Sequence, residues 1–91
     1  MAEVGGDLET LRTLHRGLGE LGDQASEMKS KGDAHLHQTV WKGANSEKFR
    51  TAWEEFKPSF DRLQQALHEG RDDIRVQHNN IAAATGEPAA I

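Results

Sequence analysis

The sequence predicts an all-α protein, an antiparallel two-helix hairpin with a Trp-x-Gly turn that dimerises into a four-helix bundle. Apolar residues recur at steps of three and four in both halves of the 91-residue chain, which is the spacing of helices that pack along a seam. A short segment rich in turn-forming residues separates the two halves. A hairpin alone forms one layer, so its apolar seam needs a second hairpin to be removed from water.

The first helix is expected over about residues 8–38. Asp7 is placed to cap its start by accepting a hydrogen bond from a free backbone N–H, and Glu9 adds negative charge in the first turn. Gly17 and Gly22 flank the seam, where a missing side chain would let another helix approach closely; the alternative is a helix that frays or breaks at its glycines. The predicted seam residues are Leu11, Leu14, Leu18, Leu21, Ala25 and Met28.

The second helix is expected over about residues 46–82 and carries larger apolar side chains. Ser46 is placed to cap it, with Glu47 in the first turn. Pro58 removes one intrahelical donor, but the seven-residue repeat places it on the outermost face, so we expect a bend rather than a break. The predicted seam residues are Phe49, Trp53, Phe56, Phe60, Leu63, Leu67, Gly70 and Ile74.

The turn between the helices, about residues 39–45, contains the tripeptide Trp41-Lys42-Gly43. Gly43 is expected to take the left-handed backbone conformation that ends the first helix. Trp41 is expected to fold over the open end of the hairpin, where it would cover the last apolar turn of both helices.

Length and composition limit the classes of function. The chain is expected to form one helical hairpin at residues 7–82, between flexible segments at residues 1–6 and 83–91. Acidic residues outnumber basic ones by 15 to 11, and the net charge of −4 opposes phosphate binding and therefore a nucleic-acid partner. No segment is apolar enough for a membrane span, and the N-terminus lacks the pattern of a classical signal peptide.

Side chains suited to catalysis or metal binding are scarce. None of the five histidines lies four residues from another, so no helix face presents a pair of metal ligands, and we interpret all five as solvated or half-buried. The serines lack a glycine-rich elbow, and Asp72 with Asp73 is interpreted as a solvated helix face. We therefore predict no catalytic residue, no cofactor and no metal site.

A Trp-x-Gly turn centred between two amphipathic helices, followed by the sequence ANSEKF and an aromatic seam, resembles the WXG family. Members of this family are small helical-hairpin proteins exported by the type VII (ESX) secretion system. The resemblance covers residues 7 to about 82, and Trp41 and Gly43 are the signature residues that carry over. It implies a homodimer, or a heterodimer with a second WXG-type protein, that is exported from the cytoplasm without a classical signal peptide.

The resemblance also gives Trp41 a second role. Together with the C-terminal segment of the partner, the turn would form a surface that an FtsK/SpoIIIE-type secretion ATPase recognises. The rival hypothesis is an intracellular coiled-coil adaptor or regulatory subunit, in which Trp41 would only close the turn.

Many members of the family also carry a Tyr-x-x-x-Asp/Glu export motif after the second helix, and this chain contains no tyrosine. Glu87 would be the acid of a degenerate signal with Ala83 at the tyrosine position, whereas His68-x-x-x-Asp72 lies too early in the helix. We interpret both as chance matches. A partner that carries the motif would then supply the export signal, which favours a heterodimer over a homodimer.

Overall fold

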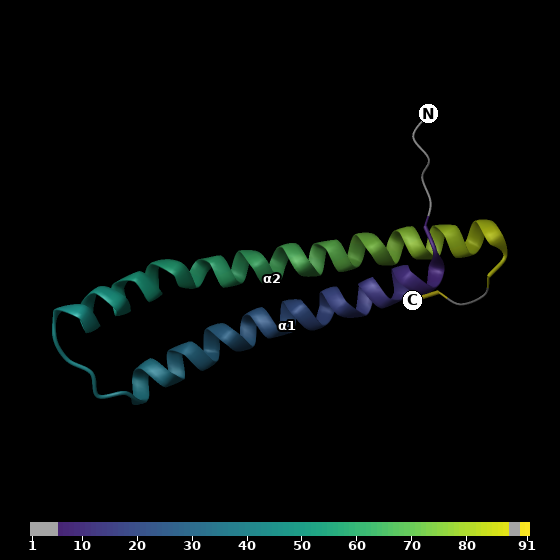
Figure 1. Ribbon diagram of the computed structural model, residues 1–91. Coiled ribbons are helices and arrows are strands. Elements are labelled where there is room, and N and C mark those ends of the chain that lie inside the picture. Colours follow the sequence, from purple (N-terminus) through teal and green to yellow (C-terminus); the bar gives the residue numbers. More distant parts are fainter. Residues whose placement is uncertain (1–5, 88–89) are drawn as a thin grey trace.

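The computed structural model describes residues 6–87 and 90–91. Two helices, α1 (Leu8–Gln38) and α2 (Ala44–Thr85), are joined by residues 39–43 and run antiparallel side by side, and the longer α2 extends beyond the start of α1 (Figure 1). No strand occurs in the described residues. The predicted all-α hairpin is confirmed, and the four-helix bundle stays a prediction.

The first helix begins as the sequence predicts. The Asp7 carboxylate accepts a hydrogen bond of 3.0 Å from the backbone N–H of Thr10, which confirms the cap. The helix is continuous through all its glycines, so the alternative of a frayed or broken helix is wrong. It ends at Gln38, and the next residue, Thr39, has an extended backbone and donates its N–H to the Leu36 carbonyl at 3.4 Å.

The start of α2 differs from the prediction in two ways. The helix begins at Ala44, and Gly43 with φ of 114° is its N-cap. Gly43 therefore starts the second helix and does not end the first. Its φ is positive, but its ψ of 177° lies outside the left-handed conformation that the sequence predicts. Ser46 lies inside the first turn with 2% of its surface exposed, and no side chain caps this helix.

Pro58 lies within α2, is exposed, and does not break the helix. The C-terminal end reaches Thr85, so residues 83–85 are helical and lie outside the tail. Gly86 with φ of 78° closes the helix, because its N–H donates to the Ala83 carbonyl at 3.4 Å and the Glu87 N–H donates to the Ala82 carbonyl at 2.8 Å. This pair of bonds satisfies carbonyls that the helix itself leaves free.

The hairpin is far too elongated to enclose a core. Its radius of gyration is 19.5 Å, whereas a compact domain of this length has about 12 Å. Its accessible surface is 6776 Å², whereas a compact monomer of this mass exposes about 5300 Å². Among the described residues the buried hydrophobic side chains are Ala25, Phe60 and Ala82.

The predicted seam divides into two rows. One row is buried or half-buried between the helices, and comprises Leu11, Leu18, Ala25, Trp53, Phe60, Leu67, Gly70 and Ile74. The second row, which we call the outer row, is 45% to 58% exposed and comprises Leu14, Leu21, Met28, Phe49, Phe56 and Leu63. Each helix therefore packs one edge of its apolar stripe against its neighbour and leaves the other edge open.

Candidate functional site

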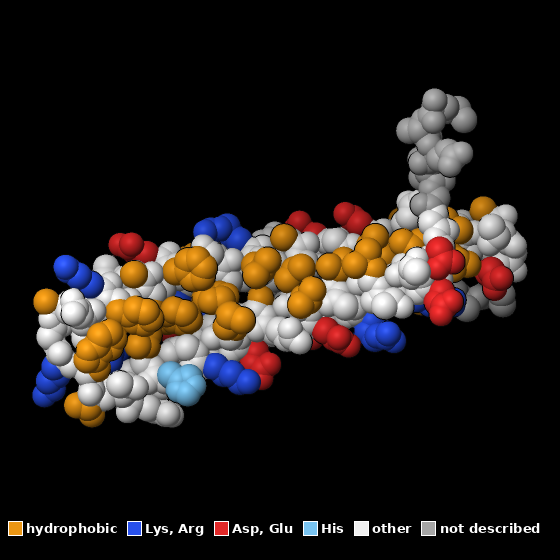
Figure 2. All heavy atoms as spheres, in the orientation of Figure 1, with side chains coloured by type: hydrophobic (Ala, Val, Ile, Leu, Met, Phe, Trp, Pro, Cys, Tyr) orange, Lys and Arg blue, Asp and Glu red, His pale blue; other side chains and the backbone are white. Residues whose placement is uncertain are grey.

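The outer row is the first part of the candidate site. Figure 2 shows hydrophobic side chains in a band that follows both helices over most of the length of the hairpin. On α2 the row is bordered on one side by small, uncharged residues. These lie three residues after Phe49, Phe56 and Leu63 and are Ala52, Ser59 and Ala66. An exposed apolar surface of this extent is a candidate contact site for another macromolecule.

The Trp-x-Gly turn adjoins one end of this row. The indole of Trp41 is 42% exposed and stands against the ring of Phe49, with centroids 5.9 Å apart and planes inclined by 47°. Because Phe49 is also the first outer-row residue of α2, the turn and the row form one surface. The indole therefore contacts α2. That it covers the ends of both helices, and that a receptor recognises it, both stay predictions.

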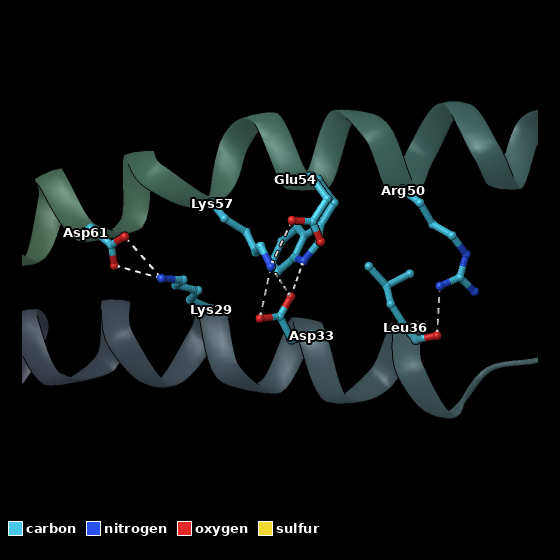
Figure 3. A network of polar contacts seen from close by, with 8 residues as sticks. Lys29, Asp33, Leu36, Arg50, Glu54, Lys57 and Asp61 are labelled. Carbon is cyan, nitrogen blue, oxygen red and sulfur yellow. Dashed lines mark hydrogen bonds and ion pairs between the residues drawn. The ribbon is translucent and has the colours of Figure 1, made fainter.

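Ser46 and Arg50 connect the turn to both helices. The Ser46 hydroxyl donates to the Trp41 carbonyl at 2.7 Å and accepts from Arg50 Nε at 3.1 Å. The same guanidinium donates through Nη1 to the Leu36 carbonyl at 3.0 Å and through Nη2 to the Thr39 carbonyl at 3.3 Å. Figure 3 shows Arg50 reaching from α2 to the end of α1. Arg50 thus satisfies carbonyls at and just beyond the end of α1.

A polar network joins the helices one turn further along (Figure 3). The Trp53 indole N–H donates to Asp33 Oδ1 at 2.7 Å, and Lys57 Nζ lies 3.1 Å from both Asp33 Oδ1 and Glu54 Oε2. Two hydrogen bonds lower the pKa of Asp33 below its ordinary 3.8, and the bond from the indole has a larger effect than the bond from Lys57. The hydrogen bonds that Lys57 donates raise its pKa above 10.5, and the bond to Glu54 has a larger effect than the bond to Asp33. Lys29 pairs with Asp61 at 3.0 Å, so polar contacts join α1 to α2 at two further positions.

Two glycines allow the helices to approach closely. A Cβ added at Gly32 would overlap the indole of Trp53, and one at Gly22 would overlap the ring of His68. The prediction for Gly22 is therefore confirmed. The prediction for Gly17 is wrong, because a Cβ there meets nothing within 4 Å.

The histidines do not form a metal site in the described part of the chain, where no group of three potential ligands occurs. His78 is fully buried, with Nδ1 3.1 Å from the Asn79 side-chain oxygen, so its interpretation as a solvated or half-buried residue is wrong. No described helix has the length and apolarity needed to cross a membrane.

Glu87 is exposed and follows directly on the Gly86 cap. Beyond it, the backbone of Ile91 is held by the side chain of Asn79, through bonds of 2.8 Å from the Ile91 N–H and 3.0 Å to its carbonyl. The end of the chain thus folds back on α2. Whether Glu87 belongs to an export signal stays a prediction.

The sequence analysis missed Gly32, Arg50 and the residues of the polar network around Asp33, and it misread Ser46. Gly32 continues the seven-residue series of Leu18 and Ala25, and that spacing was a usable signal. Ser46 and Arg50 are spaced by four, which places them on one helix face, but no pattern in the sequence indicates the partners that they reach across the turn.

The comparisons with known proteins agree with this geometry. A family model described as "Proteins of 100 residues with WXG" matches residues 9–84. No curated protein and no solved structure gives a significant match. The match covers both helices and the turn that contains Trp41 and Gly43. The chain therefore belongs to the WXG100 family, whose members are small, non-enzymatic helical proteins of type VII secretion that form dimers with WXG partners.

Proposed function

We propose that this chain is a substrate and structural partner of a type VII secretion system. It is made in the cytoplasm, dimerises through the outer row, and is exported without a classical signal peptide. The Trp-x-Gly turn is the element by which an FtsK/SpoIIIE-type ATPase recognises the dimer. The single observation that carries the proposal is the outer row, six large apolar side chains left 45% to 58% exposed along one face.

The energetic argument is that the hairpin lacks a second layer. A stable domain packs at least two layers around a core, and here only three hydrophobic side chains of the described chain are buried. A second hairpin laid on the outer row would bury it and produce a four-helix bundle. Folding and association are then coupled, so the stability of the protein depends on its concentration.

The position of the turn supports its proposed role. Trp41 stands on Phe49, at one end of the outer row, so a partner that covers the row ends beside the indole. Exposed aromatic side chains of this kind often dominate recognition, because they bury a large area with few rotatable bonds. The ATPase would then contact the turn and the neighbouring end of the partner at the same time.

The expected partner is a second WXG-type protein. The chain has no tyrosine, and α2 continues through Ala83 at the position where the export motif would begin. A partner with a complete motif would supply the signal. A homodimer is the second candidate, since two-fold symmetry would place the Phe side chains of one α2 against the smaller side chains of the other chain's α1.

Co-expression with a short neighbouring WXG-type reading frame, followed by native mass spectrometry and assay of the culture medium, tests the proposal. Leu63→Asp places a charge in the outer row and is expected to abolish the dimer and export. Val76→Asp is the matched control, because Val76 is 53% exposed on α2 but lies outside the row.

The possible outcomes separate the hypotheses. A mass equal to one chain of each protein supports the heterodimer, and a mass of twice this chain that does not exchange supports the homodimer. A dimer that stays inside cells with an intact secretion system favours the intracellular adaptor. A Leu63→Asp protein that still dimerises would overturn the proposed interface.

A further inference from the structure

We propose that Ser46 and Arg50 are positioning residues that hold the Trp-x-Gly turn in one conformation, so that Trp41 is presented to its receptor already ordered. This inference rests on the proposed function of Trp41. It goes further in assigning the order of the turn to two residues of α2 that do not themselves belong to the Trp-x-Gly tripeptide.

Besides the bonds from Ser46 and Arg50, the segment 39–43 is held by the contact of the Trp41 indole with Phe49 and by the 2.6 Å bond from the Thr39 hydroxyl to the His35 carbonyl. Val40 is 89% exposed, and a Cβ added at Gly43 would meet nothing within 4 Å. The Trp41 carbonyl accepts the 2.7 Å hydrogen bond from Ser46, and Ser46 is among the most buried polar residues of the described chain. The Arg50 guanidinium then ties Ser46 to the end of α1 through the Leu36 and Thr39 carbonyls.

The geometry of the guanidinium is essential to this arrangement. Arg50 uses three separate nitrogens for the Ser46 hydroxyl and for carbonyls on both sides of the end of α1. A lysine has the charge but only one nitrogen, so it cannot bridge the same three acceptors. A turn that is ordered before binding loses less conformational freedom when the receptor binds, and affinity rises accordingly.

The chain contains controls for both changes away from the turn. The Thr13 hydroxyl donates to the Glu9 carbonyl at 3.1 Å on the exposed surface of α1, and Arg62 donates to the Ser59 hydroxyl at 2.8 Å on α2. Thr13→Ala and Arg62→Lys therefore repeat the loss of a hydroxyl and the loss of a guanidinium without touching Trp41. Ser46→Thr is the conservative variant, because it keeps the hydroxyl.

The experiment measures turn mobility and export in the full chain with its partner. The chain has two tryptophans, so Trp41→Phe assigns the two indole N–H signals of the ¹⁵N-labelled protein, and heteronuclear NOE values report the motion of Trp41. We expect Ser46→Ala and Arg50→Lys to lower the Trp41 NOE and to reduce export by roughly fivefold or more, the loss expected from about 1 kcal/mol of ordering. Helicity and dimer mass should persist, Ser46→Thr should restore both readouts, and the Thr13 and Arg62 variants should match the wild type.

Each contrary outcome has one meaning. If Trp41→Phe prevents export while Ser46→Ala and Arg50→Lys export normally, the positioning role is wrong and the proposed function stands. An unchanged Trp41 NOE in both variants also overturns the positioning role. Normal export of Trp41→Phe overturns the recognition role of the turn, on which the positioning role rests. If Arg50→Lys loses helicity, the comparison of Ser46→Ala with Ser46→Thr decides the question, since neither residue change alters the Arg50 bonds to α1.

Discussion

Phe56→Ala and Phe60→Ala should have different effects, although both rings belong to one apolar stripe. Phe60 is 8% exposed and contacts Trp53 and Phe56 at centroid distances of 5.5 Å and 5.1 Å. Phe56 is 54% exposed. Removal of the Phe60 ring leaves a cavity between the helices, whereas removal of the Phe56 ring mainly removes surface that a partner would cover.

The magnitudes follow from these exposures. For Phe60→Ala we expect a loss of about 3 to 5 kcal/mol in the free energy of unfolding. For Phe56, about half of the roughly 200 Å² of an aromatic side chain is open. At about 25 cal/mol per Å², covering this area contributes about 2.7 kcal/mol to association. Phe56→Ala should therefore weaken a heterodimer about 100-fold, and a homodimer about 10⁴-fold because the contact occurs twice.

Sedimentation equilibrium measures the association, and circular dichroism during urea denaturation measures the helices. Phe56→Ala should keep its helicity at high protein concentration while its Kd rises. Phe60→Ala should unfold at a lower urea concentration than the wild type at every protein concentration. Val76→Ala, outside the outer row, is the control and should change neither quantity. A Phe56→Ala protein with the wild-type Kd would refute the reasoning that the outer row is the interface.

The remaining predictions concern the turn, the close helix contact and the polar network. Trp41→Phe should leave helicity and dimer mass intact and prevent export, because an exposed aromatic at the turn serves binding more than stability; protein in the medium at wild-type levels would contradict this. Gly32→Ala should destabilise the hairpin by about 1 to 3 kcal/mol in urea denaturation because the added methyl group meets the Trp53 indole. Gly17→Ala adds its methyl group into open space and should stabilise the hairpin by about 1 kcal/mol. Equal effects of the two substitutions would refute the assigned helix contact. Asp33→Asn should lower the melting temperature at neutral pH. Because the pKa of Asp33 is lowered in the folded protein, the carboxylate contributes fully to stability above the unfolded-state pKa of 3.8, and this contribution disappears as the pH falls through the folded-state pKa. The difference in melting temperature between variant and wild type should therefore vanish in acid. A difference independent of pH would show that the carboxylate charge is not its source.

The sequence alone determined the two helices, the place of the turn and the family. These properties are local, since the steps of three and four, the Asp7 cap and the Trp-x-Gly tripeptide can be read without knowledge of any distant contact. The same pattern did not reveal which half of the apolar stripe faces the neighbouring helix. Phe56 and Phe60 are equally apolar, and only the packing of α1 against α2 buries one and leaves the other open.

The tertiary structure also decided the roles of the polar residues at the turn. The sequence predicts that Ser46 caps the second helix, because a serine followed by an acidic residue is typical of a helix start. In the structure its hydroxyl donates to the carbonyl of Trp41, five residues earlier. Arg50 and Asp33 have ordinary surface character in the sequence, and they acquire partners only because antiparallel packing brings residues 11 to 24 positions away within hydrogen-bond distance. The spacing of apolar residues in the sequence shows which residues share a helix face. The partners of a polar side chain depend instead on the alignment of the two helices. That alignment is set by side-chain packing, such as that of Trp53 on Gly32.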